Sequence, residues 1–292
     1  MQGVLSKSSA IPIKYINAFI VGIVTFFWSY RYWDNDTVSV LLMKPFVYRQ
    51  LSLLSAKFFM LLGASFEMAL VIVMVISGIY FYFTIRALAQ EYYDISQNEI
   101  TIMLLVLLGM WLFIYFRKPY DLLTAWLFTL AFYYIQTDWN KYYLLFPIIC
   151  INRETAFLLI LVFFIHTLRE WKLVKVFVLL QIIVFGLISF LLRYLLAGHP
   201  GNEVWIEPVE NLMKFITHPW QTLLHLSIGG LLMILVYKGW KSKPRLLRIA
   251  FVTILPLLIL LYLMCGQAFE VRIFWEVYPV TALLILDTLI WR

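Results

Sequence analysis

Long apolar stretches alternate with short polar breaks along almost the whole chain. A helix that crosses the roughly 30 Å hydrocarbon core of a bilayer needs about 20 mainly apolar residues. Stretches of this kind recur throughout the sequence. The pattern predicts an all-α protein with membrane segments at residues 15–30, 58–84, 100–116, 122–136, 142–168, 173–197, 220–237, 249–265 and 274–290.

The stretch 142–168 decides the topology because it contains Arg153 and Glu154. As one helix it would hold both charges near the middle of the membrane. It would also invert every later loop, so that the basic run 238–248 would face outward, whereas Lys and Arg favour cytoplasmic loops. We therefore expect two half-length helices, 142–151 and 157–168, joined at the outer face. This arrangement gives ten membrane segments with both termini in the cytoplasm.

The composition excludes a soluble globular protein. Of the 292 residues, 63% are hydrophobic and only 13% are charged, and the mean hydropathy is +0.89. Values of this kind are typical of a polytopic membrane protein. Because the polar breaks are short, residues 1–292 are predicted to form a single transmembrane domain, integral to the plasma (inner) membrane.

The net charge of +7 follows from this topology. In the ten-segment arrangement most lysines and arginines lie in cytoplasmic loops, as the positive-inside tendency requires. No nucleic-acid motif accompanies them, so the expected partner is the bilayer and not a nucleic acid. Cys150 and Cys265 both lie in apolar stretches and form no metal-binding or disulfide pattern.

Asp34 and Asp36 follow the first membrane segment directly, in the sequence RYWDND. Carboxylates at the membrane surface would meet an amphiphilic substrate there. Either could act as a general base, or the two could hold a divalent cation. A solvated loop whose charges only end the helix is the alternative, and the spacing does not decide which carboxylate would be the base.

Residues 45–54, PFVYRQLSLL, interleave apolar and aromatic residues with Arg49 and Gln50. This pattern is typical of a helix that lies along the membrane interface. Such a helix would present Arg49 to an anionic headgroup of a substrate. An amphipathic connector whose Arg49 reaches toward phospholipid phosphates fits the same pattern.

Arg117 and Asp121 flank Pro119 in a tight outer turn between two membrane segments. Both are candidates for substrate binding. A structural role also fits, because an aspartate at a helix N-terminus interacts favourably with the helix dipole, and Arg117 could anchor at lipid headgroups.

The sequence Asn152-Arg153-Glu154-Thr155 interrupts a hydrophobic run. Polar groups are costly there unless they face a cavity or pair with one another, and broken helices of this kind commonly form binding sites. Arg153 could hold a phosphate through two hydrogen bonds while Glu154 orients it or pairs elsewhere. A purely structural Arg–Glu pair is the alternative.

Glu270 and Arg272 lie two residues apart in the connector before the last segment. A short connector needs no charge pair, so we interpret Arg272 as a second phosphate ligand with Glu270 beside it. The outer histidines His199 and His218 match no metal motif, and any metal requirement stays open.

The order and sidedness of these elements resemble the membrane module of the GT-C superfamily of polyprenyl-phosphate-sugar glycosyltransferases, which includes protein O-mannosyltransferases and lipid A aminoarabinose transferases. The resemblance covers residues 10–175, with 176–292 as additional C-terminal helices. The matching features are an acidic motif (Asp34 to Asp36), an interface helix (45–54), a basic cytoplasmic turn at Arg86, an outer turn (Arg117 and Asp121) and a polar break (152–155).

The resemblance implies an inverting transfer of a sugar from a polyprenyl-phosphate-linked lipid to an acceptor at the extracytoplasmic face. One of Asp34 and Asp36 would activate the acceptor, and Arg153 and Arg272 would hold the donor phosphate. Glu154 and Glu270 would orient these arginines. The sugar and the acceptor are not specified by the sequence.

Two other functions fit the same residues. A lipid-linked saccharide transporter or polymerase-like protein would bind the phosphate with the same arginines and would tolerate Asn in place of Asp34 and Asp36. A non-catalytic membrane subunit would need no outer charge for lipid binding and would bury an apolar helix face against a partner.

Overall fold

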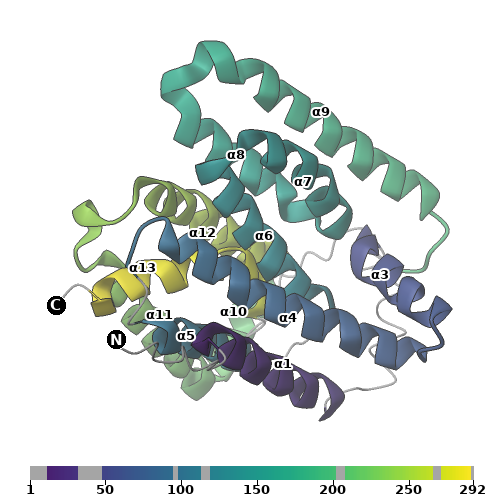
Figure 1. Ribbon diagram of the computed structural model, residues 1–292, viewed down its shortest axis with the longest axis horizontal. Coiled ribbons are helices and arrows are strands. Elements are labelled where there is room, and N and C mark those ends of the chain that lie inside the picture. Colours follow the sequence, from purple (N-terminus) through teal and green to yellow (C-terminus); the bar gives the residue numbers. More distant parts are fainter. Residues whose placement is uncertain are drawn as a thin grey trace, which may run out of the picture.

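The computed structural model describes residues 12–31, 48–94, 98–112, 119–201, 208–265 and 271–290. The regular structure of these ranges is helical, which confirms the all-α prediction. The α-helices in Figure 1 are α1 (Ile13–Arg31), α3 (Gln50–Leu61), α4 (Phe66–Gln90), α5 (Glu99–Leu112), α6 (Pro119–Thr137), α7 (Trp139–Asn152), α8 (Phe157–Thr167), α9 (Trp171–Leu195), α10 (Pro208–Thr217), α11 (Pro219–Tyr237), α12 (Arg245–Cys265) and α13 (Tyr278–Ile290). The 3₁₀ helices are η2 (Glu154–Ala156), η3 (Leu168–Glu170), η4 (Trp240–Ser242) and η5 (Val271–Glu276).

Four helices in the described ranges are long and apolar enough to cross a membrane. They are α4, residues Val174–Leu195 of α9, α11 and α12. Shorter apolar helices accompany them, among them α3, α5 and α13. These lengths and compositions indicate a membrane protein, as the hydropathy pattern predicts.

The helix predicted over residues 58–84 begins later than predicted. Helix α3 continues to Leu61, and the chain then turns at Gly63, whose φ of 94° lies in the left-handed region that glycine favours. The hydroxyl of Ser65 accepts a hydrogen bond from the backbone N–H of Met68 at 3.3 Å and caps α4. Residues 58–61 therefore belong to the preceding helix, because the turn and the cap separate two apolar runs that are continuous in sequence.

The predicted break inside 142–168 is confirmed. Helix α7 ends at Asn152 and α8 begins at Phe157. Between them the backbone of Arg153 is extended, with φ −158° and ψ 136°. The chain therefore leaves the helical path at the charged residues, and two short helices replace one long one.

Helix ends meet at two places. We call the place where the starts of α1 and α5 meet the end of α4 the termini end, and the place where α7 gives way to α8 the break end. At the termini end, Nε of Arg86 in α4 donates to Oε1 of Glu99 at 2.7 Å, and the Tyr82 hydroxyl donates to Oε2 at 3.1 Å. Asn17 in α1 donates to the carbonyl of Glu99 at 3.2 Å. The start of α1, the last turns of α4 and the start of α5 therefore meet. Figure 1 shows the start of α1 and the end of α13 on the same side of the molecule.

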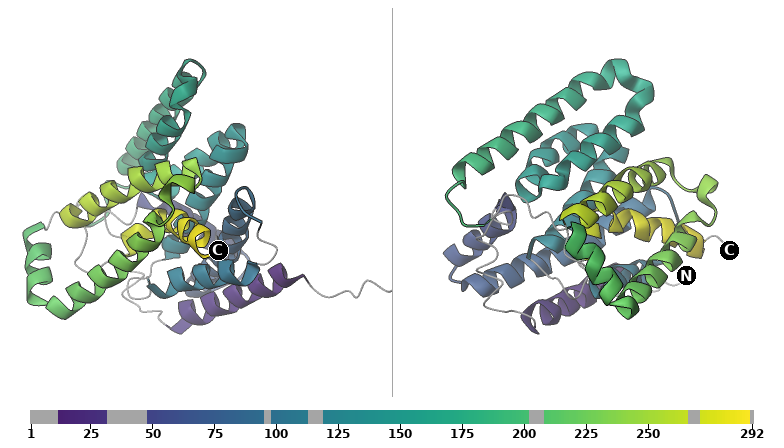
Figure 2. Two further views of the ribbon diagram at one scale, coloured as in Figure 1. Left: turned by 90° about the vertical axis from the view of Figure 1, so that its left-hand side faces the viewer. Right: turned by 180° about the vertical axis from the view of Figure 1, so that it is seen from behind.

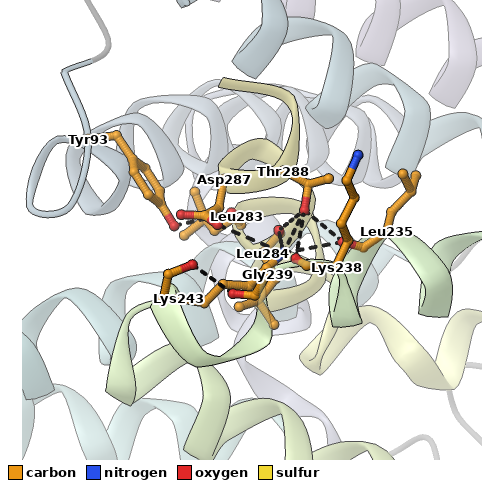
Figure 3. Close-up of polar contacts among 10 residues, drawn as sticks. Tyr93, Leu235, Lys238, Gly239, Lys243, Leu283, Leu284, Asp287 and Thr288 are labelled. Carbon is orange, nitrogen blue, oxygen red and sulfur yellow. Dashed lines mark hydrogen bonds and ion pairs between the residues drawn. The ribbon is translucent and has the colours of Figure 1, made fainter. Parts of the chain in front are cut away.

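Lys243 ties the turn between α11 and α12 to the end of α13, also at the termini end (Figure 3). Its fully buried ammonium group donates to the carbonyl of Leu235 at 3.2 Å, to the carbonyl of Leu284, and to Oγ1 of Thr288 at 2.7 Å. The carboxylate of Asp287 lies 4.0 Å away. Because an ammonium group has three donors, this set of acceptors satisfies it completely.

Many strongly exposed apolar side chains lie on α9, α10 and α11. Figures 1 and 2 show α9 along one edge of the molecule, beside α7 and α8, with α10 and α11 on another side. Phe190 of α9 and Trp220 of α11 are largely exposed. In α10 the exposed apolar residues Val209, Leu212 and Ile216 recur at helical spacing. Such surfaces fit contact with lipid.

Candidate functional site

Arg153 is the centre of a buried polar cluster at the break end. Its side chain is almost fully buried between two carboxylates that come from other parts of the chain. Nη1 lies 3.3 Å from Oδ1 of Asp121, in the first turn of α6. Nε lies 2.7 Å from Oε1 of Glu276, the last residue of η5. The guanidinium group thus joins the α7–α8 break to the start of α6 and to the segment before α13.

Two neutral side chains fix the break on either side of Arg153. The hydroxyl of Thr155 donates to Oε1 of Glu276 at 2.7 Å, and the amide of Asn152 donates to Oγ1 of Thr124 at 2.9 Å. Both donors are buried. Since buried polar groups are costly without partners, these bonds hold the extended backbone at Arg153 in one position.

Arg49 and Glu154 form a second ion pair at the edge of the cluster. Nη2 of Arg49 lies 2.7 Å from Oε1 of Glu154, and Nε donates to Oε2 at 3.3 Å. The Arg49 side chain is 9% exposed, whereas the Glu154 side chain is 43% exposed. Burial alone would raise the pKa of the Glu154 carboxyl, but the charge and hydrogen bonds of Arg49 outweigh it and lower this pKa to about 2. Glu154 is therefore ionised at any ordinary pH.

The described side chains of this cluster carry an excess of negative charge. Three carboxylates, from Asp121, Glu154 and Glu276, face the guanidinium groups of Arg49 and Arg153. Oε2 of Glu276 is buried and has no hydrogen-bond partner among the described residues.

The structure brings together four of the residues selected from the sequence: Arg49, Asp121, Arg153 and Glu154. They come from the residue that precedes α3, from α6 and from the α7–α8 break. The Glu154 carboxylate accepts hydrogen bonds from Arg49, so it pairs elsewhere in the chain, which is one of the two arrangements that the sequence allowed. The carboxylates against Arg153 come from Asp121 and Glu276.

The remaining selected residues are only partly covered by the structure. Asp34, Asp36, Arg117 and Glu270 lie outside the described residues. Arg272 belongs to η5, the 3₁₀ helix that carries Glu276, but its side chain is not described. Arg272 therefore belongs to the same short helix as Glu276, four residues before it.

Glu276 is the residue that sequence reasoning missed. It sits between Trp275 and Val277 at the start of the apolar run predicted as the last membrane segment. A lone acid in an apolar segment is itself a signal, because such residues are usually paired. That signal could have identified Glu276 as a partner for one of the buried arginines.

No group of three or more His, Cys, Asp or Glu side chains that could hold a metal ion occurs in the part of the chain that the structure describes. Asp34 and Asp36, the carboxylates for which a divalent cation was considered, lie outside that part. In comparisons with known proteins, no family model, no curated protein and no solved structure matches this chain.

Proposed function

We propose that this chain is an integral membrane glycosyltransferase that moves a sugar from a polyprenyl-phosphate-linked donor to an acceptor at the outer face. One observation carries the proposal: Arg49, Asp121, Arg153 with Glu154, and the η5 segment meet at one end of the helices. Three separate sequence motifs and Glu276 thus contribute to one polar cluster. The GT-C-like order of these motifs supplies the reaction class.

In the proposed reaction the bond between the anomeric carbon and the phosphate oxygen breaks as an acceptor oxygen or nitrogen bonds to that carbon, with inversion. One of Asp34 and Asp36 takes the acceptor proton, and polyprenyl phosphate leaves with the electron pair. Guanidinium groups stabilise the charge that develops on the leaving phosphate. Because Arg153 is buried between two carboxylates, we assign it the role of positioning the break.

The proposed topology is multi-pass in the plasma membrane, with both termini and the termini end in the cytoplasm and the break end outside. Contacts at the two ends support it: Glu99 at the start of α5 pairs with Arg86 near the end of α4, and Asp121 at the start of α6 pairs with Arg153 just after α7. Lys238, Lys241 and Lys243 lie in the turn at the termini end, and such basic turns favour the cytoplasmic side.

The test is release of free polyprenyl phosphate from a panel of polyprenyl-phosphate sugars by the purified protein in detergent, where water takes the place of the acceptor and receives the sugar. Asp34→Asn and Asp36→Asn are compared with the wild type, and Glu210→Gln serves as control because Glu210 is an exposed residue of α10. We expect the wild type and the control to release the lipid, and one of the two Asn variants to lose release. The residue whose loss abolishes turnover is the base.

The transporter function predicts a different result. In that case no donor is consumed, both Asn variants bind the lipid as the wild type does, and binding still depends on the arginines. If the lipids neither turn over nor raise the thermal midpoint of unfolding, the protein is a non-catalytic subunit and the glycosyltransferase proposal is wrong.

A further inference from the structure

The two arginines of the cluster occupy different environments. Arg153 is buried with both of its carboxylate partners, Asp121 and Glu276. Arg49 is paired with Glu154, whose side chain is 43% exposed. A ligand could reach the Arg49 pair from the surface of the cluster, whereas a ligand for Arg153 would have to separate buried charges. The structure therefore distinguishes two guanidinium groups that the sequence treats alike.

We propose that the Glu154 carboxylate occupies the place on Arg49 that the phosphate of the lipid donor takes, so that donor binding displaces Glu154. This inference rests on the proposed function, because it names Arg49 as the phosphate ligand of that same site. The ligand class is a phosphate ester on a long polyprenyl chain.

The geometry of the pair supports an exchange of one anion for another. Nη2 and Nε of Arg49 face the two carboxylate oxygens of Glu154 at 2.7 and 3.3 Å. Phosphate oxygens match the same pair of N–H donors, and arginine commonly binds either anion through two hydrogen bonds. A phosphate can therefore replace the carboxylate without any movement of the buried part of Arg49.

The position of Glu154 allows it to leave. It lies in η2, between the two short helices, and its exposed side chain can rotate toward solvent. Its neighbours Arg153 and Thr155 are held by Glu276, so the backbone need not follow. With a pKa of about 2 the carboxylate stays charged, and therefore a competing anion, not a proton, must release it.

Displacement has a measurable consequence, because the phosphate must compete with an internal carboxylate. A hydrogen bond to a charged group contributes enough to change an affinity by about tenfold. Glu154→Gln keeps the shape of the side chain and removes its charge. We expect this variant to bind polyprenyl phosphate about tenfold more tightly than the wild type.

The experiment measures the affinity of the full chain, in nanodiscs of phosphatidylcholine, for polyprenyl phosphate added as the probe. The variants are Glu154→Gln, Arg49→Gln and the double variant, with Glu210→Gln as a control that removes a carboxylate elsewhere. Glu154→Gln should bind more tightly, Arg49→Gln more weakly, and the double variant like Arg49→Gln. The control should bind like the wild type. Should Glu154→Gln fold poorly, Glu154→Asp retains the charge on a shorter side chain and should still tighten binding.

A second titration with phosphatidylglycerol separates the lipid donor from ordinary headgroups. If Glu154→Gln tightens binding of both lipids equally, the site recognises phosphate headgroups in general and the assignment to the polyprenyl donor is wrong. Unchanged or weaker binding of polyprenyl phosphate by a folded Glu154→Gln or Glu154→Asp protein overturns the displacement itself.

Turnover distinguishes this inference from the proposed function. If the wild type consumes donor but Glu154→Gln binds no more tightly, the displacement fails and the enzyme assignment stands. If binding tightens as expected but no donor is consumed, the displacement holds in a lipid-binding protein that is not a transferase. In an active enzyme, Glu154→Gln should lower the donor KM.

Discussion

Nε of Arg153 lies 2.7 Å from Oε1 of Glu276, so a residue in the middle of the chain is held by one next to the last helix. The contact joins the GT-C-like part of the sequence to the C-terminal helices that follow it. The polar break between α7 and α8 therefore depends on both halves of the chain for its geometry. Truncation after residue 175 would remove the most deeply buried carboxylate of the cluster.

Glu276→Ala should strongly destabilise the protein. It leaves Arg153 with one fewer counter-charge and removes the acceptor of Thr155. Loss of one partner from a buried ion pair typically costs about 3–5 kcal/mol. Unfolding in detergent, followed by heat or denaturant, measures the effect. Glu276→Gln should cost less, because it can still accept from Thr155, and Glu210→Ala should change little.

The ion pair of Arg49 and Glu154 should make stability depend on pH in a defined direction. Because the folded-state pKa of Glu154 is about 2, against an ordinary value of 4.5, its contribution is complete above about pH 4.5 and is lost as pH falls toward 2. The measurement is the difference in thermal midpoint between the wild type and Glu154→Gln. It should be constant from pH 7 to 5 and shrink below 4.5. A difference at pH 3 that is as large as the difference at pH 7 would contradict the assignment.

Local features of the sequence predicted much of the helical framework. The all-α class and the break at Arg153 follow from hydropathy and the cost of buried charge, and the structure confirms both. The start of α4 was misplaced because Gly63 and the Ser65 cap interrupt an apolar run without changing its hydropathy. Helix α10 was not predicted, since a short amphipathic segment resembles a polar connector.

The pairing within the site could not be predicted from spacing. Arg49 and Glu154 are 105 residues apart, and the packing of α3 against α6 and α7 brings them together. Adjacent residues Arg153 and Glu154 invite the interpretation of a local pair, yet their partners come from different elements. Sequence can indicate which residues need counter-charges, but the choice among several carboxylates depends on tertiary contacts.

The proposed topology predicts which exposed positions react from outside the cell. Ala197, after α9, and Lys238, after α11, are both exposed and belong to opposite ends in the proposed arrangement. In a background with Cys150 and Cys265 replaced by alanine, Ala197→Cys should react with a membrane-impermeant maleimide in intact cells. Lys238→Cys should react only after permeabilisation. Labelling of position 238 in intact cells would invert the proposed orientation.

Lys243→Met should release the turn between α11 and α12 from α13. The substitution leaves the carboxylate of Asp287 and the buried carbonyls without their ammonium partner, which should cost about 3–5 kcal/mol. The exposed neighbour Lys241 provides the matched control, Lys241→Met. If charge is the cause, Lys243→Met/Asp287→Asn should recover part of the loss, as measured by unfolding in detergent.

Gly109→Ala should weaken the packing of α5 against the start of α13. A Cβ on Gly109 would overlap the ring of Tyr278, whose hydroxyl donates to the carbonyl of Leu105 in the same helix α5. Overpacking of a buried contact typically costs about 1–3 kcal/mol, more than the gain of up to about 1 kcal/mol from replacing a helical glycine by alanine.

Gly186→Ala in α9 is the matched control, because nothing lies within 4 Å of the added Cβ. It should leave the thermal midpoint unchanged or raise it. The steric cause is tested by adding Tyr278→Leu, which removes the ring. Gly109→Ala should then cost less in the Tyr278→Leu background than in the wild type, and equal costs in both backgrounds would show that the close approach of α5 to Tyr278 does not limit stability.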